Sequence, residues 1–149
     1  MGLTGFLEKL VLSSNSSTRS TITSSQAPHF IRRPLCGIEI MREISKSELK
    51  LVNYLLEKAG KPTQIPKMVR PLKDGGMGSI SFDLKESRKR DSQIIGGSFK
   101  DSDGVLVDFE LTADENNELF ELDLWKVDFS RLLKYPQLNE ITITPHNNG

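Results

Sequence analysis

The sequence has little of what builds metal or disulfide sites: one cysteine, Cys36, and two histidines, His29 and His146. A single cysteine excludes an internal disulfide framework and any multi-cysteine zinc site. The 20 basic side chains are balanced by 20 acidic ones, so the chain lacks the cationic surplus of a nucleic-acid binder. No apolar run approaches the ~18 residues of a membrane-spanning helix. We therefore predict no metal, no cofactor, no nucleic-acid partner and no membrane partner.

The first part of the chain has little apolar material to bury. Ten of the thirteen residues 13–25 are serine or threonine, a composition that predicts disorder over residues 1–39. An amphipathic stretch of about ten residues precedes this run and is marginal as an isolated helix. Three interpretations stay open for residues 1–39: a plain tail, a targeting segment, or an extension from an upstream start codon ahead of Met41.

A helix signature follows directly. Ser45 and Glu48 have the spacing of a capping box, and Ile44 and Leu49 have that of a hydrophobic staple. Gly60 stands where a helix ends in the left-handed conformation. The pattern predicts a helix over residues 46–58, with an apolar face made of Leu49, Leu51, Val52, Leu55 and Leu56.

From residue 67 onward the apolar period changes from 3.6 to 2, which is typical of strands. We expect strands at 67–70, 79–84, 94–99, 105–112 and 120–124, joined by turns at 73–76, 101–104 and 114–117 and by a charged loop at 85–91. The Gly96-Gly97 pair indicates a bulge or a close backbone approach. The prediction is an α+β domain over 40–136, in which one helix packs on a mostly antiparallel meander of four or five strands. Residues 137–149 are predicted to be a loose tail.

The apolar positions change parity near the end of this pattern. In the last strand they are even-numbered from Phe120 to Leu124 and odd-numbered after it, at Trp125, Val127 and Phe129. A strand cannot exchange its faces without an extra residue, so we predict a bulge or a strand end at 124–125 that turns Trp125 inward. The alternative is a strand that continues in register and leaves Trp125 outside as a binding anchor. Ser130 is expected to cap one helical turn.

Acidic residues are concentrated late in the chain. Residues 1–100 carry 17 basic and 9 acidic side chains, whereas residues 101–149 carry 3 and 11. The alternation places five acids on the sheet face opposite the apolar one. Such a face is often merely solvated, but it can also attract a basic protein. The candidate partner-binding residues are Asp83, Asp108, Glu110, Glu121 and Asp123.

A glycine-rich segment is the other candidate site. Residues 74–79 (DGGMGS) could cradle a phosphate with backbone N–H groups, but the spacing is not that of a P-loop and no helix follows. A tight turn is the favoured interpretation, as it also is for DSDG at 101–104, whose glycine position does not fit a calcium loop. Cys36 and His29 lie outside the patterned domain and are disfavoured as a catalytic pair. The ligand-binding alternative uses Asp74, Gly75, Gly76, Gly78, Ser79 and Trp125.

Three segments together resemble a known group: DGGMGS (74–79), DSDGVLVDFEL (101–111) and LFELDLWKVDFS (119–130). They are similar to a family of short, uncharacterised bacterial proteins, a domain-of-unknown-function group, over about Met41 to Pro136. The resemblance implies a cytoplasmic bacterial protein and assigns no chemistry. Small orphan bacterial domains are often immunity proteins of toxin systems, so the resemblance associates this chain with that class.

Two function classes follow for this chain. The first is a non-enzymatic protein-binding module of immunity type that uses the acidic face. The second is a small ligand-binding or enzymatic domain built around residues 74–79. No catalytic residue is assigned, and enzyme activity is the less favoured interpretation.

Overall fold

The computed structural model describes residues 40–145, and the expectations for 1–39, Cys36, His29 and His146 lie outside that range. Helix α2 spans Lys46–Ala59 and begins with the predicted capping box. The Glu48 N–H donates to the Ser45 hydroxyl at 3.2 Å, and the Glu48 carboxylate accepts from the Ser45 N–H at 2.7 Å. Gly60 ends the helix with φ 65°. Within the described residues, no helix is long and apolar enough to cross a membrane.

Every strand pairing in the sheet is antiparallel, in the order β1-β2-β3-β6-β5-β4-β7. The predicted α+β architecture is confirmed, with β1 and β7 as additional strands. A short 3-10 helix, η2, spans Leu138–Glu140. The strands are β1 Arg42–Glu43, β2 Met68–Pro71, β3 Ile80–Ser81, β4 Arg90–Lys100, β5 Leu106–Asp114, β6 Leu119–Lys126 and β7 Thr142–Thr144.

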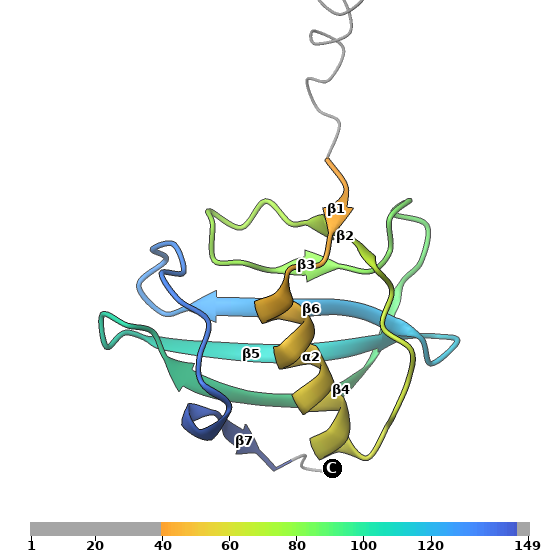
Figure 1. Ribbon diagram of the computed structural model, residues 1–149. Helices are drawn as coiled ribbons and strands as arrows, with labels where there is room; N and C mark the ends of the chain where they lie inside the picture. Colours follow the sequence, from red (N-terminus) through yellow and green to blue (C-terminus); the bar gives the residue numbers. More distant parts are fainter. Residues whose placement is uncertain (1–39, 146–149) are drawn as a thin grey trace, which may run out of the picture. The chain divides into compact units, whose positions relative to one another are not determined.

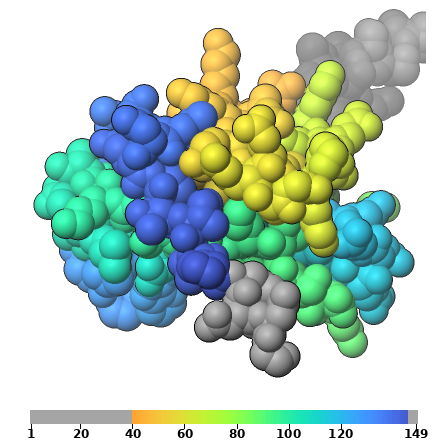
Figure 2. Space-filling view, turned by 90° about the horizontal axis from the view of Figure 1, so that it is seen from below, coloured from red at the N-terminus to blue at the C-terminus, as the bar shows by residue number. Residues whose placement is uncertain are grey.

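Helix α2 crosses one face of the sheet, which we call the inner face (Figure 1). The C-terminal segment lies beside the helix on the same side, as Figure 2 shows in yellow and dark blue. Its residues Leu132, Tyr135, Ile141 and Ile143 pack against the core. The core is therefore a single layer between the sheet and these covers, built from Leu51, Val52, Leu55, Leu56, Val69, Ile80, Phe82, Ile95, Phe99, Val107, Phe109, Leu111, Leu119, Leu122 and Leu124.

The glycine pair in β4 marks a close backbone approach. β4 runs unbroken through Gly96 and Gly97, and its register shifts lie closer to its beginning. A Cβ on Gly97 would lie 2.7 Å from the Phe109 ring and would collide with the Thr142 carbonyl oxygen. Gly97 therefore allows β7 to pair with β4.

Several predicted boundaries are wrong. The strand expected at 79–84 is only β3, and the charged loop expected at 85–91 already enters β4 at Arg90. Ser130 caps no helical turn, because residues 129–137 have no regular structure. Residues 138–144 form η2 and β7, not a loose tail. These segments depend on contacts with distant strands, which local periodicity does not report.

Candidate functional site

The pairing of β5 with β6 decides where Trp125 points. Val107 pairs with Lys126, Asp108 with Trp125 and Phe109 with Leu124, without interruption. The irregularity in this pairing lies between Leu111 and Ala113 instead. The predicted bulge at 124–125 and the inward Trp125 are therefore wrong. Trp125 faces away from the core on the outer face and is 49% exposed.

Lys126 occupies the inner position in place of an apolar residue. Its side chain is completely buried, and its ammonium donates to Asp101 Oδ2 at 2.8 Å and to Asp103 Oδ2 at 2.7 Å. A third bond reaches the Arg131 carbonyl oxygen at 3.2 Å. A buried charge is tolerated only when it is paired and hydrogen-bonded, and these partners satisfy all three ammonium hydrogens.

The Asp101 carboxylate extends this buried cluster into the segment after β6. It accepts the N–H of Leu133 at 2.8 Å and that of Lys134 at 3.0 Å. Burial opposes the ionisation of Asp101, but Lys126 and the backbone N–H groups outweigh it and lower the pKa of Asp101 to about 2. The cluster therefore ties residues 127–134 to the hairpin between β4 and β5.

An exposed apolar surface lies at this end of the sheet. We call Leu106, Trp125, Val127 and Phe129 the aromatic corner; they are 39%, 49%, 45% and 65% exposed. The rings of Trp125 and Phe129 meet edge to face, with centroids 5.1 Å apart. The Val127 N–H donates to the Leu106 carbonyl oxygen at 3.0 Å, which joins the two strands here. Neighbouring exposed apolar side chains of this size mark a candidate interaction surface.

Four of the five predicted acids lie on the outer face, and two of them flank Trp125. Asp108 is directly opposite Trp125 across the β5–β6 pair, and Asp123 is two residues earlier on β6. Within residues 40–145, neither of these exposed carboxylates forms an ion pair. Cross-strand and i±2 neighbours on one sheet face are within reach of a shared partner.

The other two acids on the outer face are in different surroundings. Glu110 forms an ion pair with Arg90 of β4. Glu121 is half-buried, and burial together with the charge of Asp123 raises its pKa, while Arg70 and Arg90 act in the opposite direction. Of the four acids on the outer face, Asp108 and Asp123 are therefore the exposed ones without an ion pair in the described residues, and both are neighbours of Trp125.

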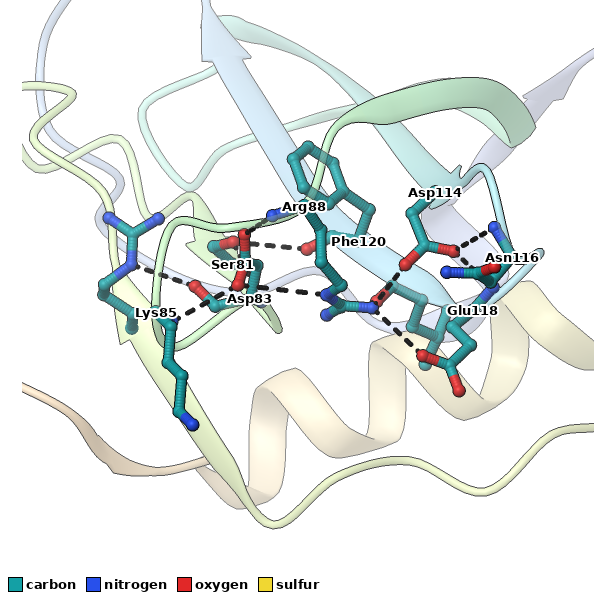
Figure 3. Close-up of polar contacts among 10 residues, drawn as sticks. Ser81, Asp83, Lys85, Arg88, Asp114, Asn116, Glu118 and Phe120 are labelled. Carbon is teal, nitrogen blue, oxygen red and sulfur yellow. Dashed lines mark hydrogen bonds and ion pairs between the residues drawn. The ribbon is translucent and has the colours of Figure 1, made fainter.

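Asp83 does not belong to the acidic face, so this part of the prediction is wrong. It is 4% exposed and follows β3, where its carboxylate accepts the N–H of Arg88 at 2.7 Å. The Arg88 guanidinium lies 3.8 Å from Asp83 and donates to Asp114 at 2.7 Å (Figure 3). Asp83 is thus part of a second ion cluster, which fastens the 82–89 loop to the turn between β5 and β6.

The glycine turn at 74–79 lies beside β6. The Asp74 carboxylate accepts the N–H groups of Gly76, Met77 and Ser79, at 3.1, 3.0 and 2.7 Å. The Ser79 hydroxyl donates to Asp123 at 3.0 Å, so the turn and the acidic face meet at this strand. Gly75, like Gly76 and Gly78, has a positive φ. Three amides that a phosphate would need are occupied by the chain's own carboxylate, which supports the turn interpretation.

A groove of 810 Å³ lies on the helix side of the molecule. It runs along α2, contains none of the predicted site residues, and is lined in part by Leu49, Tyr54, Leu56, Pro62 and Leu138. Among the residues that the structure describes, no three histidine, cysteine or acidic side chains form a metal-binding group.

The fold and this surface define an α+β domain in which, within residues 40–145, a helix covers one sheet face and no helix covers the other. Residues 41–136 match the model of a domain of unknown function, DUF6984, and the chain belongs to that family. This is the range over which the three sequence segments carried the resemblance. No curated protein and no solved structure matches the chain.

Sequence reasoning missed Lys126 and its partners as a structural unit. The even-numbered positions Leu122 and Leu124 point to residue 126 as the next inner position, and Asp101 and Asp103 lie in the turn that could reach it. Because Lys126 is charged, the apolar pattern does not show that the strand continues in register to this residue. Leu106 and Phe129 were also absent from the predicted sites, because an isolated exposed apolar residue has no sequence signature.

Proposed function

We propose that the chain is a non-enzymatic protein-binding module that binds a basic protein through the outer face of β5 and β6. One observation carries the proposal: Trp125 is half-exposed and adjacent to two carboxylates, Asp108 and Asp123, that have no ion-pair partner within residues 40–145. Tryptophan is enriched at the centres of protein interfaces. Uncompensated charge beside it favours a partner of opposite sign and speeds encounter with it.

The two faces of the sheet have different roles, which supports this interpretation. The inner positions of β5 and β6 are buried under α2 and the C-terminal segment, so they hold the fold together. The outer positions are not needed for the core. The glycine turn at 74–79 offers less to a ligand, because Asp74 already holds its amides.

A more specific form of the proposal is an immunity-type protein in the bacterial cytoplasm, whose acidic face covers a basic surface of a toxin. The neighbouring gene tests this form alone. We expect an adjacent reading frame that encodes a basic, toxin-like protein. An unrelated neighbour in every genome that carries the gene would contradict the immunity interpretation and leave the binding module in place.

Selection from a phage-displayed library of random peptides tests the general proposal without a known partner. We expect peptides that bind the immobilised full chain to be rich in arginine and lysine. Their binding should weaken as salt is raised, because exposed charges are screened over ~8 Å at physiological ionic strength.

A charge-matched pair of variants completes the test. Asp108→Asn with Asp123→Asn should weaken the selected peptides at least about tenfold, or ~1.4 kcal/mol. The control, Glu57→Gln with Glu115→Gln, removes two exposed acids outside the outer face and should bind as the unmodified chain does. Peptides without basic residues, or equal losses in both variants, would refute the proposal.

A further inference from the structure

We propose that the aromatic corner recognises an arginine side chain, with the guanidinium group on the Trp125 ring and next to Asp108 and Asp123. This inference rests on the proposed function and names the chemistry at its centre. It follows from the placement of an exposed indole beside two exposed carboxylates that lack ion-pair partners in the described part of the chain.

The geometry suits a flat cation. Asp108 is the direct cross-strand neighbour of Trp125, and Asp123 is its neighbour on the same strand and face. Side chains directly opposite each other are about 5 Å apart, and those two residues apart on one strand are about 7 Å apart, so one guanidinium can contact the ring and a carboxylate together. The Phe129 ring meets the indole at 73°, and this packing limits the orientations available to the indole.

The buried cluster around Lys126 also holds the aromatic corner in place. Lys126 before Phe129, and Leu133 and Lys134 after it, are all bonded to Asp101 in the buried cluster. The Phe129 N–H donates to the Lys126 carbonyl oxygen at 2.9 Å, which closes a turn with Phe129 at φ 62°. Because these bonds fix the segment before any partner arrives, binding orders little additional chain.

Arginine fits this site better than lysine. A guanidinium is planar, stacks on aromatic faces and is more weakly hydrated than an ammonium, and its N–H fork matches a carboxylate.

A basic side chain of the protein itself, Lys100, lies on the same face. It pairs across the strands with Leu106 of the aromatic corner. Lys100 makes no ion pair in the described residues and would oppose an incoming cation.

The single tryptophan makes the test direct, because the full chain has one indole N–H resonance in a proton–nitrogen NMR spectrum. The probes are acetyl-arginine amide, acetyl-lysine amide and the neutral isostere acetyl-citrulline amide. We expect the arginine probe to shift the indole resonance and the amides of β5 and β6 around Asp108 and Trp125. The lysine probe should act at higher concentration, and the citrulline probe should have no effect.

Variants assign the response to the named groups. Asp108→Asn with Asp123→Asn should raise the arginine concentration at half-saturation at least about fivefold, and Lys100→Gln should lower it. Glu57→Gln with Glu115→Gln should leave it unchanged. An equal response to citrulline, or an arginine response that survives loss of both aspartates, overturns the inference.

The two proposals fail separately. If library peptides need Asp108 and Asp123 but no arginine probe or peptide shifts the indole resonance, the arginine site is wrong and the binding module stands. If no basic peptide is selected although free arginine shifts the indole, the protein-binding function is wrong.

Discussion

The two faces of the β5–β6 ribbon differ although alternate residues of the same two strands build them. Val107 and Leu124 on the inner face are completely buried, whereas Trp125 on the outer face is half-exposed. The contrast is not simply one of polarity, because the inner face contains a lysine and the outer face a tryptophan. What decides each position is the cover above it and the partners within reach. The buried residues of the inner face therefore stabilise the fold, whereas the exposed Trp125 belongs to a surface that does not contribute to the core.

Removing the charge from the inner face should have the largest effect on stability. In Lys126→Met, the buried Asp101 and the half-buried Asp103 lose their counter-charge, and unpaired buried charges are strongly unfavourable. We expect the midpoint of urea unfolding to fall by about 1 M or more. The control Lys100→Met, on an exposed side chain, should shift the midpoint little. Equal midpoints for the two variants would contradict this view of the inner face.

Crowding the inner face should have the next largest effect. Gly97→Ala places a methyl group against the Phe109 ring and the β7 backbone, and overpacking of this kind costs about 1–3 kcal/mol. Urea unfolding measures the loss, and amide exchange should rise at 142–144 where β7 pairs with β4. Ser98→Ala, the adjacent position on the outer face, should be nearly neutral. Protected β7 amides in Gly97→Ala would show that the close approach is not required.

Lowering the pH should weaken the contacts of the buried Asp101 carboxylate. Because the folded-state pKa of Asp101 lies at about 2, below its unfolded value of ~3.9, the stability it contributes is present above the unfolded value. That contribution is lost as pH falls from about 4 toward 2. Glu48, Asp83 and Asp114 also have lowered pKa values and act in the same direction. Thermal unfolding at stepped pH should show the loss, and Asp101→Asn should flatten it; an equal slope in both proteins would contradict the assignment.

The smallest expected change in stability is at the aromatic corner. Phe129 holds a left-handed backbone, φ 62°, that is unfavourable for a bulky residue and natural for glycine. The free energy of unfolding of Phe129→Gly should therefore lie within about 1 kcal/mol of that of the unmodified chain. Phe129→Ala keeps the backbone penalty and should be less stable than the glycine variant, by about 1 kcal/mol. If alanine were the more stable replacement, the strain would not be real. Both variants should bind basic peptides less well.

Local patterns predicted the parts of the fold that depend on near neighbours. The capping box at Ser45 and Glu48 located the helix, and period-2 alternation located Asp108 and Asp123 on the face opposite the core. The strands β1 and β7 have two and three residues, so only their pairing with distant strands defines them. The inner position of Lys126 depends on Asp101, 25 residues earlier in the chain. The spacing of apolar residues alone does not predict a buried ion pair between residues so far apart in the chain.

The affinity of a selected basic peptide for Trp125→Ala tests the central claim most directly, because Trp125 is the residue on which the outer-face assignment and the proposed function meet. We expect binding at least about tenfold weaker, or ~1.4 kcal/mol, in a protein that remains folded. Urea unfolding of the same variant should show a loss well below the ~3–5 kcal/mol of a buried tryptophan. Unchanged affinity, or a loss of stability of that full size, would contradict the account.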